Sequence, residues 1–110
     1  MKLSHEPFVA IKEKRKTIES RLFDEKRQLI STGDEIVFSE NDNEAESPIR
    51  TRVVNLFRYL TFEELFAHHD PALFGGERNQ IQLLEQIKQF YSDEDEQEYG
   101  VVGIEIERID

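Results

Sequence analysis

Apolar and polar residues alternate with a period of two in four stretches of the chain, which is the pattern of a β-strand with one buried face. The four stretches are residues 17–23, 35–38, 49–60 and 101–109. In the last of them, Val102, Ile104 and Ile106 alternate with a glycine and two glutamates. The alternation predicts four or more strands in a mainly antiparallel sheet.

Apolar residues at helical spacing between these stretches predict helices on the outside of the sheet. One helix is expected after Ser4, with Phe8 and Ile11 packing inward, and a second is expected after Thr61. A third is expected over residues 78–91, with an apolar side made of Ile81, Leu84, Ile87 and Tyr91.

Three further segments carry capping or turn signals. Asp95 follows Ser92 at the spacing of a capping box, so a helical turn is expected where the acidic run 93–98 begins. The polar segment 40–47 predicts a hairpin loop. Residues 68–76, with one proline and two glycines, predict an irregular connection.

Length and composition limit the fold and the location. The 110 residues fit one domain over residues 1–110, without an internal repeat or a linker. The pattern therefore predicts an α+β fold, a mainly antiparallel β-barrel with helices packed outside. No apolar run exceeds the four residues 8–11, so we expect neither a membrane span nor a secretory signal, and a cytoplasmic location. The lack of cysteine excludes thiol catalysis.

The formal charge of −10 is unevenly distributed along the chain. Residues 1–30 carry +3, residues 31–60 carry −3 and residues 61–110 carry −10. A protein that coats nucleic acid is expected to be basic, because phosphate neutralisation provides most of its non-specific affinity. Any nucleic-acid contact of this chain is therefore expected to be local, on the basic N-terminal third.

The main candidate site begins with two opposite charges on one strand. Glu19 and Arg21 are two residues apart in the half-buried strand 17–23, so both point to one face, and Ser20 points to the other. They form either a structural ion pair or a site in which Arg21 binds a phosphate or base edge that Glu19 orients. Lys16, in the preceding turn, completes an anion site on the second interpretation.

Two further residues are candidates for ligand binding. Arg58 lies on the long strand and extends a basic groove if its face borders the site. Tyr59 either stacks on a base or belongs to the core with its hydroxyl hydrogen-bonded. His68 and His69 precede an aspartate, but adjacent histidines point in different directions and no third ligand has a suitable spacing. We therefore expect no metal site and no cofactor.

Five short blocks of the sequence occur in an order that resembles one known family. They are residues 16–21 (Lys-Thr-Ile-Glu-Ser-Arg), 33–34 (Gly-Asp), 58–59 (Arg-Tyr), 62–65 (Phe-Glu-Glu-Leu) and 91–95 with 99–106. Their order and spacing resemble the ASCH domain family, which has a PUA-like β-barrel fold, over nearly the whole chain. The glycine that usually precedes the family's lysine is absent here, where Lys14 and Arg15 stand instead. This turn is therefore expected to be built differently.

The resemblance implies an RNA- or nucleotide-linked role, in a cleft between barrel and helices that the Lys-x-x-Glu-x-Arg block lines. One branch of the family resembles acetylcytidine amidohydrolases, which use a lysine, a threonine nucleophile three residues later and a distant glutamate. Lys16 matches the lysine, but Glu19 occupies the threonine position. That activity is therefore not expected for this chain.

Three functions remain open on the sequence alone. The first is binding of RNA or a nucleotide-like ligand through Lys16, Glu19 and Arg21, with Arg58 and Tyr59 as further ligand-binding residues. The second is a small hydrolase acting on a modified nucleoside or RNA, with Lys16 or Glu19 as general base. The third is an acidic protein-interaction module. A basic concave pocket would favour the first two functions, and an unbroken acidic face would favour the third. The sequence does not determine the oligomeric state.

Overall fold

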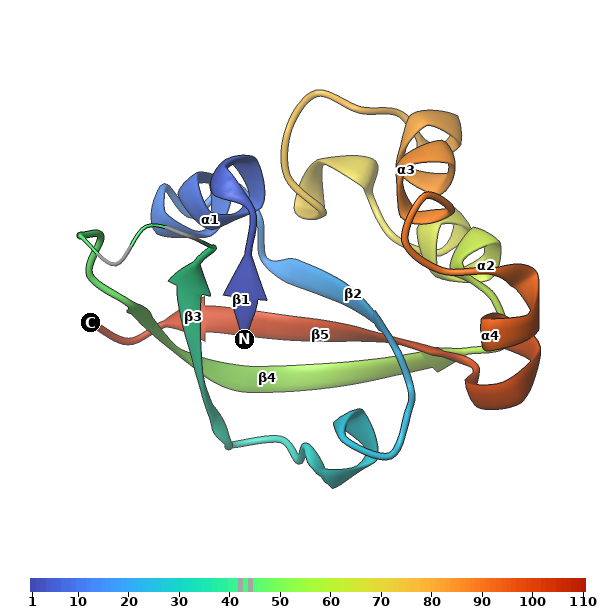
Figure 1. Cartoon of the computed structure of the whole chain (residues 1–110), viewed down its shortest axis with the longest axis horizontal. Helices are drawn as coiled ribbons and strands as arrows, with labels where there is room; N and C mark the ends of the chain where they lie inside the picture. Colours follow the sequence, from blue (N-terminus) through green and yellow to red (C-terminus); the bar gives the residue numbers. More distant parts are fainter. Residues whose placement is uncertain (42, 44) are drawn as a thin grey trace.

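In the described part of the chain, five strands form one curled sheet with the helices packed around it (Figure 1). The computed structural model describes residues 1–41, 43 and 45–110. The strands are β1 (Lys2–Leu3), β2 (Ile18–Leu22), β3 (Glu35–Glu40), β4 (Ile49–Tyr59) and β5 (Val101–Arg108). The helices are α1 (His5–Lys12), α2 (Phe62–Ala67), α3 (Gln80–Ile87) and α4 (Asp93–Tyr99), with the 3₁₀ turns η1 (Arg27–Leu29) and η2 (Pro71–Leu73).

The strand order is β1-β3-β4-β5-β2, so β1 and β2 are the two edges of the sheet. β1 pairs in parallel with β3, and all other neighbours are antiparallel. The sheet curls into a half-barrel with helices outside it, which confirms the predicted α+β fold and its mainly antiparallel barrel. The sequence does not predict β1, because two residues are too few to show a period.

Two apolar clusters form the core, and β5 contributes to both. Val102, Ile104 and Ile106 belong to the cluster that α1 closes with Phe8 and Ile11, as the sequence pattern predicted. The other cluster joins β2 and the start of β5 to α2 and α3. The helices α2 and α3 are therefore held against the sheet by a core of their own, separate from the one under α1.

Two backbone features allow the sheet to contribute to both clusters and allow α2 to pack closely against it. A register shift between Val53 and Asn55 marks a bulge in β4, and the extra residue changes which side chains face each cluster. Val53 therefore packs in the α1 cluster, whereas Phe57 packs against the α2 cluster. Gly103 faces α2, where an added Cβ would lie 2.8 Å from Leu65 Cδ1. Glycine at this position thus permits the close approach of α2 to the sheet.

The third helix differs from its prediction. α3 begins at a capping box formed by Asn79 and ends at Ile87, before the predicted end at residue 91. Its buried residue is Leu83, which is 5% exposed, whereas Ile81, predicted to face the core, is 69% exposed. The prediction for Ile81 is wrong because the side of α3 that packs inward carries Leu83, Leu84 and Ile87.

The acidic run predicted to begin with a helical turn forms the helix α4. The Ser92 N–H donates to Asp95 Oδ2 at 3.0 Å, and the Asp95 N–H donates to Ser92 Oγ at 3.2 Å, which confirms the capping box. The acidic side chains of the first turn suit the positive end of the helix.

Two other expectations concern the loop and the membrane. The hairpin loop predicted for residues 40–47 includes residues 42 and 44, which lie outside the described residues. Strand β3 continues to Glu40, the first residue of that segment. In the part of the chain that the structure describes, the helices lack the length and apolar character needed to cross a membrane.

Candidate functional site

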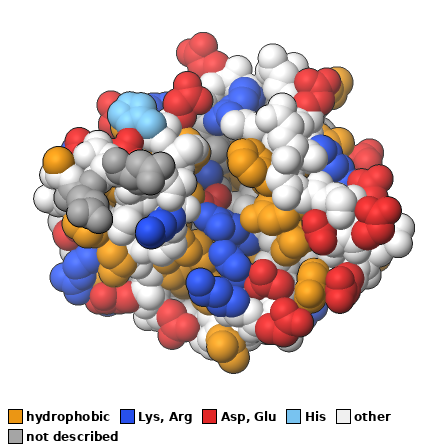
Figure 2. Space-filling view, in the orientation of Figure 1, with side chains coloured by type: hydrophobic (Ala, Val, Ile, Leu, Met, Phe, Trp, Pro, Cys, Tyr) orange, Lys and Arg blue, Asp and Glu red, His pale blue; other side chains and the backbone are white. Residues whose placement is uncertain are grey.

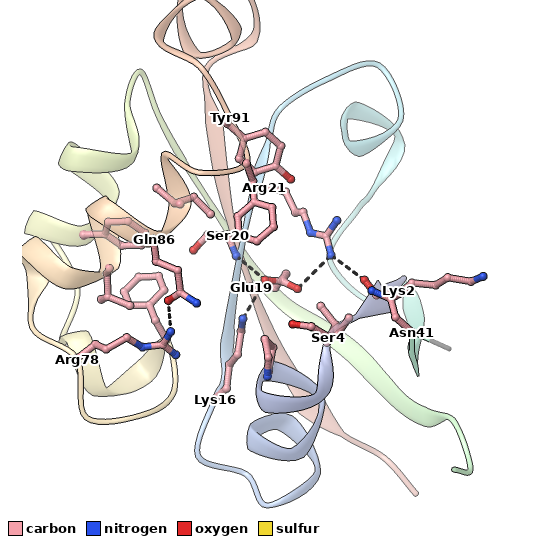
Figure 3. Close-up of a pocket in the computed structure, with 17 residues that line it drawn as sticks. Lys2, Ser4, Lys16, Glu19, Ser20, Arg21, Asn41, Arg78, Gln86 and Tyr91 are labelled. Atoms are coloured by element: carbon pink, nitrogen blue, oxygen red, sulfur yellow. Dashed lines mark hydrogen bonds and ion pairs between the residues drawn. The ribbon is translucent and has the colours of Figure 1, made fainter. Parts of the chain in front are cut away.

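A cavity of about 290 Å³ lies along the free edge of β2, between the sheet and the helices (Figures 2 and 3). Its charged wall carries Lys16, Glu19 and Arg21, and its opposite wall comes mainly from α3 and the segments around it. Figure 2 shows Lys and Arg side chains gathered in the middle of this face, with hydrophobic side chains beside them and acidic ones toward the margin. The structure therefore brings the three main sequence candidates together in one cavity.

Glu19 is at the centre of the charged wall and contacts both cations (Figure 3). Its Oε1 accepts hydrogen bonds from Lys16 Nζ and from the Ser20 backbone N–H, both at 3.0 Å. Its Oε2 accepts one from Arg21 Nη2 at 3.3 Å. Arg21 Nη2 also donates to the Lys2 carbonyl at 3.4 Å, which links the two edge strands of the sheet. One carboxylate thus holds two cations, so this group has a positive net charge.

The burial of Glu19 differs from the sequence prediction. The alternation predicted a half-buried strand, but the Glu19 residue is only 4% exposed, and Ser20, on the other face, is 9% exposed. Both faces are covered: Ile18 and Leu22 pack in the α2–α3 cluster, and on the other face Glu19 lies between Lys16 and Arg21, whose guanidinium reaches the Lys2 carbonyl. Ser20 also lines the cavity, which follows the edge of the strand.

The surroundings of Glu19 determine its charge. Burial by itself raises the pKa of this carboxyl, but the positive charges of Lys16 and Arg21 and their hydrogen bonds have the larger combined effect. The pKa of Glu19 is therefore lowered below its ordinary value. At neutral pH the cavity contains an ionised carboxylate, which can only accept hydrogen bonds.

The end of α1 positions Lys16 at the cavity. Lys14 adopts φ +64°, the left-handed conformation that glycine usually occupies at a helix end. The Lys14 N–H donates to the Ile11 carbonyl at 3.0 Å, and the Arg15 N–H donates to the Ala10 carbonyl at 2.9 Å. These two bonds form a Schellman motif. The turn therefore keeps the geometry of a glycine-ended helix although it contains no glycine.

The opposite wall of the cavity is mostly apolar and aromatic. Its apolar members are Phe66, Phe74, Leu83, Ile87, Phe90 and Tyr91. The Tyr91 ring stacks on Phe62, with the ring centroids 5.6 Å apart and the planes at 18°, so the core holds Tyr91 from behind. Phe90 is 71% exposed, which leaves a large aromatic ring accessible beside the cavity.

Sequence analysis missed Arg78, a further arginine of this cavity. It lies in the loop before α3, and its guanidinium donates to Gln86 Oε1 and, at 3.4 Å, to the Gly75 carbonyl. Gly76 has φ +73°, and an added Cβ there would lie 3.2 Å from Arg78 Nη2. One feature of the sequence could have drawn attention to Arg78, because it is the only Lys or Arg between residues 59 and 87. Its segment has no helix or strand period, however, so the sequence does not predict where its side chain points.

Neither Arg58 nor Tyr59 is among the described residues that line this cavity. The Arg58 guanidinium lies 3.8 Å from the centre of the Phe23 ring. The Tyr59 hydroxyl lies 3.0 Å from His69 Nε2, and its ring stacks on His68 with the centroids 5.2 Å apart. Their predicted part in ligand binding stays a prediction, without support from the cavity.

Both histidines therefore contact Tyr59, His69 through the hydroxyl and His68 through ring stacking. Among the described residues, no three or more His, Asp or Glu side chains are grouped so that they could hold a metal ion. The residue that follows, Asp70, accepts a hydrogen bond from the Ala72 N–H at 3.0 Å and so caps η2. The segment therefore forms the helix-end connection that the sequence indicated.

Known proteins resemble this chain over its full length. The ASCH domain model matches residues 1–110. The crystal structure of the hypothetical protein PH0355, from Pyrococcus, is similar with a TM-score of 0.82 and 33% identity, covering 99% of this chain and 100% of that one. The NMR structure of protein PF0455 from Pyrococcus furiosus is similar with a TM-score of 0.72 and 31% identity, covering 100% and 99%. No curated protein sequence matches the chain significantly.

Proposed function

Because the chain belongs to the ASCH domain family, which is generally associated with RNA binding, we propose that this cavity binds one nucleotide unit, either free or within an RNA. The observation that carries the proposal is a local positive charge in a chain of net charge −10. Among the residues that the structure describes, the charged ones that line the cavity are four cations and one carboxylate: Lys2, Lys16, Arg21, Arg78 and Glu19. Such a lining attracts an anion to a surface that otherwise repels it.

The two walls of the cavity match the two parts of a nucleotide. Lys16 on the charged wall suits a phosphate, and Arg21 on the same wall suits a phosphate or a base edge, because both donate charge-assisted hydrogen bonds. Phe90 and Tyr91 on the other wall suit the flat face of a base. The volume of about 290 Å³ is near the lower end of small-molecule pockets, about 300–1,000 Å³. This size supports one nucleotide unit rather than a longer stretch inside the cavity.

Glu19 gives the cavity a group that discriminates between hydrogen-bond donors and acceptors of the ligand. An ionised carboxylate accepts hydrogen bonds and donates none. It therefore favours a base with an amino group at the contacting edge over a base that presents only carbonyl oxygens there. Lys16 and Arg21 keep Glu19 ionised, so this preference holds at neutral pH.

The geometry supports ligand binding over the other two functions. A basic concave pocket favours a ligand site over an acidic protein-interaction module. The lowered pKa of Glu19 makes it a weak general base at neutral pH, which disfavours a hydrolase that depends on this carboxylate. The position of the family's threonine nucleophile is Glu19 itself, so acetylcytidine hydrolysis by the threonine mechanism is not part of the proposal.

The test is the affinity for the four nucleoside 5′-monophosphates and for a short single-stranded RNA, measured by calorimetry. We expect Arg21→Ala to weaken binding at least about tenfold, because it removes one charge-assisted hydrogen bond. Its free energy of unfolding should fall by about 2–3 kcal/mol, because the substitution leaves the buried Glu19 with Lys16 as its remaining cation. Arg50→Ala is the matched control, because Arg50 pairs with Glu35 on the β3–β4 hairpin outside the cavity. Wild-type affinity in Arg21→Ala would contradict the proposal and favour the interaction module.

A further inference from the structure

We infer that Arg78 binds the phosphate group of the ligand, at the end of the cavity that it shares with Lys16, and that the base lies toward Tyr91. This inference rests on the proposed function and adds an orientation to it. It also assigns a role to an arginine outside the Lys-x-x-Glu-x-Arg block.

The charge balance of the cavity distinguishes Arg78 from Lys16 and Arg21. Lys16 and Arg21 share the carboxylate of Glu19, and both lie within 3.3 Å of it. Among the described residues, no carboxylate lies within ion-pair distance of the Arg78 guanidinium, which is held by Gln86 Oε1 and the Gly75 carbonyl. Both of these acceptors are neutral. A half-buried cation with only neutral acceptors is best satisfied by an anionic ligand.

The backbone near Arg78 places it at the same end of the cavity as Lys16. Gly75, whose carbonyl accepts from Arg78, lies against the Lys16 side chain, since a Cβ added at Gly75 would be 3.0 Å from Lys16 Cβ. Residues Lys16 and Phe74 also form a β-bridge. In Figure 3, Lys16 and Arg78 lie on one side of Glu19 and Tyr91 lies on the other. The anion end and the aromatic end of the cavity are therefore separate.

The Gln86 side chain holds the Arg78 guanidinium in place. Gln86 is on α3 and lines the cavity, so one hydrogen bond fixes the orientation of the arginine without neutralising it. A glutamate at position 86 has nearly the same shape but supplies a negative charge. The variant Gln86→Glu therefore tests the charge of Arg78 while the arginine itself is kept.

The experiment compares each nucleoside 5′-monophosphate with its own nucleoside, using adenosine, cytidine, guanosine and uridine. The readout is the ratio of the two affinities, measured by calorimetry in the wild type, Arg78→Ala and Gln86→Glu. We expect the wild type to favour the monophosphate, and both variants to lower this ratio about ten- to hundredfold. Arg50→Ala is the control, because Arg50 pairs with Glu35 on the β3–β4 hairpin outside the cavity. Thermal unfolding of each variant checks that it is folded.

The outcomes separate this inference from the proposed function. If the nucleosides, the nucleotides and the short single-stranded RNA all fail to bind the wild type, both are rejected. If nucleotides bind but the ratio is unchanged in Arg78→Ala and in Gln86→Glu, only the inference is rejected. A dinucleoside monophosphate, which has one phosphodiester and no terminal phosphate, identifies the source of the phosphate. An effect of Arg78→Ala on this probe as well indicates the backbone of an RNA, and an effect on monophosphates alone indicates a free nucleotide.

Discussion

Glu19 combines two properties that rarely occur together, deep burial and a full negative charge. Transfer of an isolated carboxylate from water into a protein interior costs several kcal/mol, so an unpaired Glu19 would take up a proton. Lys16 and Arg21 prevent this, and each also reaches the cavity. The same three side chains that keep β2 stable at its edge are therefore the ones that present charge to a ligand.

The lowered pKa of Glu19 has a consequence for stability. A carboxyl whose pKa is lower in the folded than in the unfolded state stabilises the fold fully above the unfolded value, about 4.3 for glutamate. That contribution is lost as the pH falls from this value toward the lowered one. We expect Glu19→Gln to lower the free energy of unfolding by about 3 kcal/mol at pH 7, near the lower end for breaking a buried ion pair. Denaturant unfolding at pH 3 to 7 measures it.

The pH series also contains the control for Glu19. The difference between the wild type and Glu19→Gln should shrink below about pH 4.3, because the unfolded wild type then takes up a proton at Glu19 that the folded protein does not. Glu35→Gln removes a carboxylate from the exposed pair with Arg50 and should cost at most about 1 kcal/mol. A difference between the wild type and Glu19→Gln that stays constant from pH 7 to pH 3 would contradict the lowered pKa.

At the scale of elements, the buried Glu96 connects the three helices α2, α3 and α4. Glu96 of α4 is 7% exposed. Its Oε1 accepts from the Phe62 N–H at the start of α2 at 2.9 Å, and its Oε2 accepts from Lys88 Nζ, just after α3, at 2.7 Å. Because α3 supplies much of the cavity's apolar wall, Glu96 helps to position that wall from outside the site.

We expect Glu96→Gln to destabilise the protein by about 1.5–3 kcal/mol, because it weakens hydrogen bonds that a buried charge makes to two other elements. The matched control is Glu98→Gln, which makes the same change on the exposed side of α4 and should stay within about 0.5 kcal/mol of the wild type. The measurement is the midpoint of denaturant unfolding together with its slope. Equal effects of the two substitutions would show that Glu96 does not connect the helices.

Some elements of the fold and some residues of the site can be predicted from the sequence, and others cannot. The strands β2 to β5 and the helices α1 and α2 could be predicted, because periodicity in the sequence reveals the side of each that packs in the core. Lys16, Glu19 and Arg21 could be placed together because they lie within six consecutive residues. Arg78 could not, because its position depends on how the irregular connection from residue 68 to residue 79 returns to the sheet.

The wrong prediction for Ile81, and the absence of Arg58 and Tyr59 from the cavity lining, have a similar cause. A bulge between Val53 and Asn55 changes which side chains of β4 face each side of the sheet, and alternation in a sequence does not reveal a bulge. Arg58 and Tyr59 follow that bulge, and both contact other parts of the surface. Ile81 was placed in the core because its spacing to Leu84 fits a helix, but the packing side of α3 is set by contacts with α2. In each case tertiary contacts determine which side of the strand or helix packs inward, and the local sequence pattern does not distinguish the two sides.

At the scale of the whole molecule, the cavity is a small basic site within an acidic protein. The chain has a net charge of −10, and residues 61–110 alone contribute −10. An RNA that extends beyond the cavity therefore meets a surface that repels its phosphates. The proposed contact is consequently confined to the few cations that line the cavity, namely Lys2, Lys16, Arg21 and Arg78.

This confinement predicts a weak dependence of RNA affinity on salt. With only a few phosphate contacts, a plot of log affinity against log salt concentration should have a slope of about −1 to −3. Arg78→Ala should make the slope shallower by about 1, as expected when one phosphate contact is removed, whereas Arg50→Ala should leave it unchanged. The measurement is binding of a short single-stranded RNA from 50 to 300 mM salt. A slope steeper than about −5 would mean that many phosphates are contacted outside the cavity, which the acidic surface of this protein does not favour.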